Sequence, residues 1–181
     1  MPDIIAIIVL IAVLVFWAKA VQRALAILDK NINNAISQIS VQLSSQWNCL
    51  AALLNLTVGN DTFDFPALTE GIKERRSITI GSPPEGIEHQ KTIIAEMVKS
   101  IMAAAEGYSE LRANPDYVTS MDTVKQYGKM INTSSLIYNE SVTRLNRAIR
   151  RFPSSMIAGS LGFSKRVFLK EVEDGSWQTP V

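Results

Sequence analysis

The segment of residues 4–16 (IIAIIVLIAVLVF) contains no polar residue, and Trp17 and Ala18 extend the apolar run to 15 residues. No glycine or proline follows before Gly59, so nothing in the sequence ends the helix where the apolar run ends. The sequence therefore predicts an N-terminal membrane anchor over residues 1–20 that continues without a break as the first helix of the remaining chain.

The length of the apolar run leaves two interpretations of this anchor. A membrane-spanning helix usually contains roughly 17–25 apolar residues, but Lys19 and Arg23 can extend their charged ends to the interface. Trp17 stands where an interfacial aromatic residue is expected. A cleaved signal peptide is the alternative, yet such a peptide begins with positive charge, whereas this chain begins Met-Pro-Asp. We therefore expect an uncleaved anchor.

The charges beside the apolar run predict its orientation. Lys19, Arg23 and Lys30 follow it, while Asp3 is the one charged residue that precedes it. Because positive residues stay on the cytoplasmic side of a membrane, we expect a short exterior N-terminus and a cytoplasmic remainder.

Composition and motifs exclude several function classes. The net charge of +1 gives no global field that would attract nucleic acid. A single cysteine (Cys49) and a single histidine (His89) leave no internal disulfide, no His-based metal site and no catalytic triad. Phosphate-binding glycine motifs and the Glu-x-x-His pairs of helical di-metal sites do not occur. The sequence predicts no enzymatic activity, no cofactor and no metal.

Apolar residues spaced three and four apart predict an all-α fold with helices over residues 28–54, 87–111 and 114–152, the first of them continuous with the anchor. The Asn114-Pro115-Asp116 sequence is a strong N-terminal signal for the last helix, and Pro153 ends it. Residues 154–162 are expected to form a short helix. The tail of residues 164–181 has no clear period.

Between the first two long helices the sequence allows alternatives. Gly59 ends the first helix, and Asp64 is expected to cap a second, shorter one near Pro66. Residues 77–86 read as a linker, and Ser82 with Glu85 has the spacing of a capping box for the next helix. Whether residues 64–80 form a separate helix decides whether the last long helix returns toward the membrane.

A ladder of amide side chains lies four residues apart on the first helix, at Asn34, Gln38, Gln42 and Gln46. These side chains either face solvent or hydrogen-bond a neighbouring helix of the same or another chain. Small residues in the apolar seam of the last helix indicate close approach of a neighbouring helix. The candidate helix–helix or self-association face consists of Asn34, Gln38, Gln42, Gly128, Ser135, Tyr138 and Asn139.

An arginine cluster closes the last helix. Arg144, Arg147 and Arg151 share a face, and Arg150 lies beside them. Cations at a helix C-terminus favour the helix dipole and are often simply solvated. The alternative is contact with anionic lipid headgroups or with an acidic partner.

Five short motifs together resemble the bacterial LemA family, in order and in spacing: NAISQISVQL (residues 34–43), LRAN (111–114), YNESV (138–142), RFP (151–153) and AGSLGF (158–163). The resemblance implies an N-terminal membrane helix in the bacterial cell membrane, followed by a cytoplasmic, antiparallel up-and-down four-helix bundle over residues 21–163. It brings no agreed enzymatic activity, and members often occur beside membrane-protease genes or act in membrane organisation.

These features together predict a non-enzymatic, single-pass scaffold or adaptor protein. We expect it to form homo-oligomers and to bind another membrane protein, such as a membrane protease, through its helical bundle. The alternative is a protein that binds anionic membrane lipids and remodels or stabilises the membrane, with Arg144, Arg147 and Arg151 on the headgroups. No nucleic-acid partner is expected.

Overall fold

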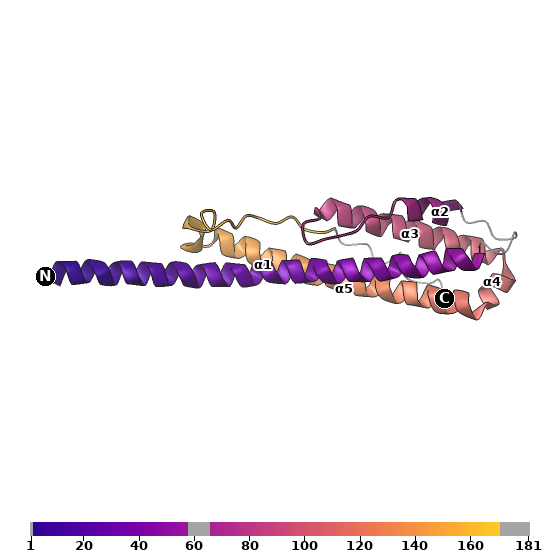
Figure 1. The fold of residues 1–181 in the computed structure, drawn as a ribbon, viewed down its shortest axis with the longest axis horizontal. Coiled ribbons are helices and arrows are strands. Elements are labelled where there is room, and N and C mark those ends of the chain that lie inside the picture. The colour runs from indigo at the N-terminus through magenta and orange to yellow at the C-terminus, as the bar shows by residue number, and fades with distance from the viewer. Residues whose placement is uncertain (1, 58–65, 171–181) are drawn as a thin grey trace. The chain divides into compact units, whose positions relative to one another are not determined.

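The computed structural model describes residues 2–57 and 66–170, and these residues form helices, turns and extended segments but no strand (Figure 1). The predicted all-α class is confirmed. The elements are α1 (Pro2–Thr57), α2 (Pro66–Lys73), α3 (Pro84–Glu106), α4 (Ser109–Ala113), α5 (Pro115–Arg150) and the 3-10 turn η1 (Ser154–Met156).

Helix α1 is a single helix of 56 residues. At 1.5 Å per residue it is about 84 Å long. Its most apolar 18-residue window has a mean hydropathy of 2.9 and is not buried by any other part of the structure. Among the described residues it is the one helix long and apolar enough to cross a membrane. The predicted continuity of the apolar segment with the following helix is confirmed.

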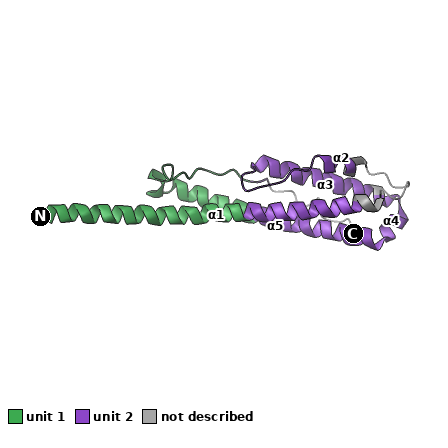
Figure 2. Cartoon of the chain, viewed as in Figure 1, with its two compact units in different colours: residues 1–34, 137–168 green, residues 35–136, 169–181 purple. Residues whose placement is uncertain are grey.

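The chain divides into two compact units, each built from separate segments (Figure 2). Unit 1 comprises Met1–Asn34 and Ile137–Phe168, and unit 2 comprises Ala35–Leu136 and Leu169–Val181. Helices α1 and α5 each contribute to both units. The predicted end of the anchor, at residue 20, therefore falls inside unit 1.

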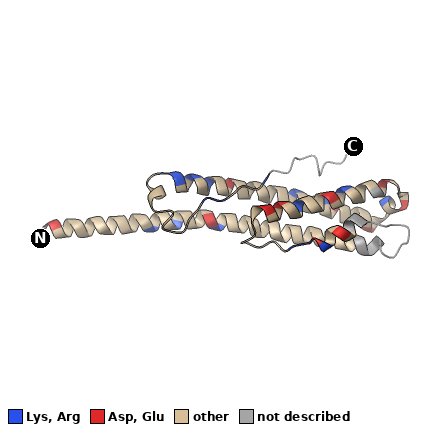
Figure 3. Cartoon of the chain, turned by 90° about the horizontal axis from the view of Figure 1, so that it is seen from above, with Lys and Arg blue, Asp and Glu red and all other residues tan. Residues whose placement is uncertain are grey.

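In unit 1, the apolar segment of α1 is bare, and one face of the helix after it is covered. Ile4 is 60% exposed, and the other large apolar residues up to Phe16 are at least 53% exposed. Trp17, Ala18 and Val21 are half-buried, and Leu25 is 1% exposed. Figures 1 and 3 both show the end of α5 and the turns after it alongside the first half of α1. Cover by this part of unit 1 thus begins where the apolar segment ends.

The core of unit 2 is formed by apolar faces of α1, α3 and α5, each with the three- and four-residue spacing that the sequence predicts. Complete burial of one such side chain contributes about 1.5–3 kcal/mol. The fully or nearly fully buried members include Ile39, Leu43, Trp47 and Leu50 on α1, Ile87, Ile94, Met97 and Val98 on α3, and Met121, Val124 and Ile131 on α5.

The N-terminus of α5 is capped as predicted. Asn114 Oδ1 accepts hydrogen bonds from the backbone N–H of Asp116 at 2.8 Å and of Tyr117 at 3.3 Å. Helix α3 begins at Pro84, near the predicted capping box, but Ser82 Oγ accepts from the backbone N–H of Thr79 at 2.9 Å instead of from the helix. Asp64, the predicted cap of α2, lies outside the described residues.

Two predicted helices are shorter in the structure. The helix expected over residues 87–111 ends at Glu106, because Gly107 follows, and the chain resumes as the separate helix α4. Residues 154–162 form a 3-10 turn and further turns instead of one helix. Gly162 ends these turns with φ +82°, a conformation that favours glycine.

Residues 64–80 do contain a separate helix, α2, but it ends at Lys73 and an extended segment follows. This segment is held in place by a buried amide on α3. Gln90 Oε1 accepts from the Arg76 N–H at 2.9 Å, and Gln90 Nε2 donates to the Glu74 carbonyl at 3.1 Å. Ser40 Oγ on α1 donates to the Ile78 carbonyl at 2.6 Å. The predicted linker is therefore docked on the core of unit 2.

Candidate functional site

The amide ladder of α1 is divided between two environments. Gln46 is 1% exposed, and its Nε2 donates to the Val124 carbonyl on α5 at 3.0 Å. Gln42 Oε1 accepts from Ser134 Oγ on α5 at 3.1 Å. Asn34 and Gln38 are exposed. Solvent exposure thus describes Asn34 and Gln38, and hydrogen bonding to a neighbouring helix describes Gln42 and Gln46.

Helix geometry explains this division. Four residues turn an α-helix by about 400°, so each step of the ladder rotates about 40° around the helix axis. Three steps rotate the side chain by about 120°, from the solvent face at Asn34 to the face packed on α5 at Gln46.

Most other members of the candidate self-association face are used inside the chain. Gly128 and Ser135 are buried. Tyr138 is buried too, and its hydroxyl donates to the Val167 carbonyl at 2.8 Å. Asn139 is half-buried. Gly128, Ser135 and Tyr138 are thus covered within the chain, which leaves Asn34 and Gln38 as the exposed members of this face.

Asn34 and Gln38 belong to a longer stripe on the exposed side of α1, in which steps of four and three residues alternate. We call it the uncharged stripe because no member carries a charge, although α1 has charged residues elsewhere. Val41, near its centre, is 66% exposed. Its eight members are exposed except Ser45, which is half-buried: Ile27, Asn31, Asn34, Gln38, Val41, Ser45, Asn48 and Ala52.

The chain's charges are unequally divided between the two units. The segments of unit 1 carry nine Lys or Arg against three Asp or Glu, a net charge of +6. The segments of unit 2 carry nine basic against 14 acidic residues, a net charge of −5. The overall charge of +1 conceals this asymmetry. In Figure 3 basic residues gather at the end of α5.

Part of the predicted arginine face is paired within its own helix. Arg144 donates to Glu140 Oε1 at 2.6 Å, and both side chains are well exposed, so the pair contributes little to stability. Helix α5 ends at Arg150, and Arg151 follows it. The structure gathers the remaining arginines around a groove of about 450 Å³, here called the arginine groove, lined by Thr143, Asn146, Arg147, Arg150, Arg151 and Phe168.

Phe168 reaches this groove because the chain after α5 turns back along unit 1. Asn146 Nδ2 donates to the Arg166 carbonyl at 2.9 Å, and Asn146 Oδ1 accepts from the Arg166 N–H at 3.0 Å. The guanidinium of Arg166 then pairs with Asp29 Oδ1 on α1 at 2.9 Å. Three separate segments of unit 1 are linked through Arg166. Sequence reasoning missed this link, because no local pattern marks it.

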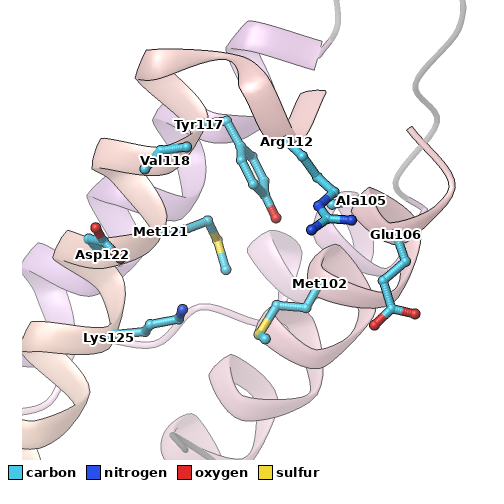
Figure 4. Close-up of a pocket in the computed structure, with 9 residues that line it drawn as sticks. All are labelled: Met102, Ala105, Glu106, Arg112, Tyr117, Val118, Met121, Asp122 and Lys125. Carbon is cyan, nitrogen blue, oxygen red and sulfur yellow. The ribbon is translucent and has the colours of Figure 1, made fainter. Parts of the chain in front are cut away.

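A second cavity, of about 460 Å³, lies where α3 ends and α5 begins (Figure 4). Met102, Tyr117 and Met121 converge on it, and Arg112 and Lys125 stand at its edge. Burial raises the pKa of the Tyr117 hydroxyl, and the positive charge of Arg112 opposes that shift. The cavity lies beside the break between α3 and α4 at Gly107, which is the sequence signal that could have indicated it.

The single cysteine and the single histidine both lie in the described part of the chain. Desolvation by burial raises the pKa of the half-buried Cys49 thiol, which favours its protonated, unreactive form. His89 is exposed, 3.7 Å from a carboxylate oxygen of Glu74. In residues 2–57 and 66–170, no group of three or more His, Cys, Asp or Glu side chains could hold a metal ion.

Comparison with known families agrees with the five motifs. A model of the LemA family matches residues 35–181. The chain belongs to the LemA family. No curated protein and no solved structure matches it significantly. The LemA match covers unit 2 and the α5 part of unit 1, and it begins after the apolar segment, about nine turns into α1.

We predict that Gln46→Ala lowers the free energy of unfolding by about 1–3 kcal/mol, because it removes a buried hydrogen bond and the packing around it. Gln38→Ala is the matched control on the same helix, and it should change stability by no more than about 0.5 kcal/mol. Urea unfolding of the full chain in detergent, followed by circular dichroism, measures both. Equal losses would contradict the division of the ladder.

We predict that Asn146→Ala frees residues 164–168 from α5, because both hydrogen bonds to the Arg166 backbone are lost. Hydrogen exchange of these residues should accelerate at least about tenfold, as expected for the loss of roughly 1.4 kcal/mol of local stability. Asn31→Ala, at an exposed position of α1, is the control. Unchanged exchange in residues 164–168 would show that Asn146 does not hold this segment.

Proposed function

We propose that this LemA-family chain is a non-enzymatic, membrane-anchored scaffold or adaptor that self-associates through the uncharged stripe of α1. Its helical part then presents binding surfaces to other membrane proteins, for example a membrane protease. The single observation that carries the proposal is that one unbroken helix bears both an uncovered apolar segment and, beyond it, a stripe of uncharged, mostly exposed residues.

The apolar segment is proposed to cross the bacterial cell membrane with its short N-terminus outside. Lys19, Arg23 and Lys30 support a cytoplasmic location for the rest of the chain. A segment of 15 apolar residues spans about 22 Å, less than the roughly 30 Å of a hydrocarbon core. The charged ends of Lys19 and Arg23 can reach the interface and allow the following apolar residues to sit within it.

The helical part is proposed to be an antiparallel up-and-down bundle of α1, α2, α3 and α5. Two hydrogen bonds in unit 2 support opposite directions for α1 and α5. Gln42 bonds Ser134, while Gln46, one turn further along α1, bonds Val124, which is earlier on α5. The extended segment between α2 and α3, held by Gln90, supports a reversal at that point.

Three properties of the uncharged stripe favour association with a second copy. Copies anchored in one membrane are parallel, so equivalent positions of two α1 helices can face each other. The alternating spacing gives the 3.5-residue period that two packed helices need. Amides such as Asn34 and Gln38 can pair across the contact and fix its register, and no member of the stripe carries a charge. Confinement to a membrane also raises the effective concentration.

Cysteine crosslinking in native membranes tests the proposal. In a Cys49→Ala background, Gln38→Cys should form a disulfide-linked dimer under mild oxidation, because equivalent stripe positions meet. Gln22→Cys, exposed on the same helix but about 140° around its axis from Ile27, should crosslink much less.

A negative charge introduced into the stripe is a second test of self-association through this face. Val41→Glu, added to the Gln38→Cys chain, should reduce the dimer because two carboxylates would oppose each other across the contact. Thr92→Glu, exposed on α3, should leave it unchanged. Equal crosslinking at residues 22 and 38, or insensitivity to Val41→Glu, would refute self-association through this face.

A further inference from the structure

The arginine groove lies at the end of unit 1 that borders the apolar segment of α1. Cover of α1 begins at Trp17 and Ala18, and within unit 1 it can come only from residues 137–168. Figures 1 and 3 show the end of α5 and the turns after it beside this part of α1. If α1 enters a membrane at Lys19, the end of α5 is therefore at the level of the lipid headgroups, a layer roughly 5–8 Å thick on each side.

The groove has the chemistry of a phosphate site. Arg147, Arg150 and Arg151 bring three guanidinium groups to one groove, and guanidinium binds phosphate oxygens in pairs. Asn146 is occupied by the Arg166 backbone and Arg144 by Glu140, whereas these three arginines have no carboxylate partner among the described residues. The net +6 of unit 1 adds a field that attracts anions.

Two large apolar side chains stand next to the groove without cover. Phe152 directly follows Arg151 and is 78% exposed, and Met156, in the 3-10 turn η1, is 72% exposed. Both are more exposed than Ile4 in the bare apolar segment, which is 60% exposed. Basic and apolar side chains side by side are typical of segments that lie in a membrane interface, with their apolar groups below the headgroups.

We propose that the arginine groove binds the phosphate of an anionic lipid in the membrane that α1 enters, while Phe152 and Met156 insert beside it. The chain then contacts the bilayer twice, through α1 and through the end of α5. This inference rests on the proposed insertion of α1 and is independent of self-association through the uncharged stripe. The proposed lipid contact differs from the face predicted from the sequence in one residue, because it includes Arg150 and does not include Arg144.

The first experiment measures lipid preference with the full chain in micelles that contain equal amounts of phosphatidylglycerol and phosphatidylcholine. Native mass spectrometry should show preferential retention of phosphatidylglycerol. The triple variant Arg147→Gln, Arg150→Gln, Arg151→Gln should lose this preference by about 100-fold, given the usual contribution of a basic residue at an anionic surface. The matched control carries Lys73→Gln, Lys99→Gln and Lys129→Gln, three exposed lysines of unit 2, and should keep it.

Two further measurements distinguish loss of lipid binding from misfolding and from binding of free anions. Replacing the same three arginines by lysine preserves their charge and should retain most of the preference, which excludes misfolding as the cause of a loss. Adding inorganic phosphate should not displace the lipid, and displacement would show a site for free anions instead. An unchanged preference in the Arg→Gln variant would overturn the proposal.

The insertion of the apolar side chains is tested separately with an environment-sensitive fluorophore in bilayer nanodiscs of the same lipids. A fluorophore at Met156→Cys, in a Cys49→Ala background, should show blue-shifted emission relative to one at Lys129→Cys. A fluorophore at Val9→Cys reports insertion of α1. A shift at residue 9 without one at residue 156 would overturn the second membrane contact alone, while no shift at residue 9 would refute the anchor.

Discussion

A backbone without glycine or proline from residue 3 to residue 58 can form one helix, and every other feature is positioned by it. Its apolar beginning is left bare, its middle carries the uncharged stripe, and its opposite face supplies apolar side chains to both units. In the proposed self-association, this stripe faces the same stripe of a second copy.

The two units differ in net charge, and unit 2 buries hydrogen-bonded amides. The segments of unit 1 carry a net +6 next to the apolar segment, where an anionic membrane surface would favour it. Unit 2 carries a net −5 and buries amides that make specific hydrogen bonds, Gln46 to α5 and Gln90 to the extended segment before α3. Buried amides stabilise one arrangement, because any other would leave them without partners. The exposed amides Asn34 and Gln38 are the ones proposed to contact a second chain.

Local signals predicted much of the fold. The unbroken α1, the Asn114 cap and the long α5 follow from residues adjacent in sequence. The division of the amide ladder also follows from helix rotation, but it requires knowing which face meets α5. The arginine groove could not be predicted, because Phe168 is placed by a link from Asn146 through Arg166 to Asp29, residues far apart in the chain. The predicted helix through Tyr108 was wrong because Gly107 ended it.

The central claim is that α1 passes from the bilayer into the helical units without a break. Hydrogen exchange of the full chain in lipid nanodiscs tests it at residues 19–24, the junction between the apolar segment and Leu25. A continuous helix predicts amide protection across this junction at a level similar to residues 26–34, because each N–H is bonded within the helix. Rapid exchange confined to residues 19–24 would show a flexible joint and contradict the account.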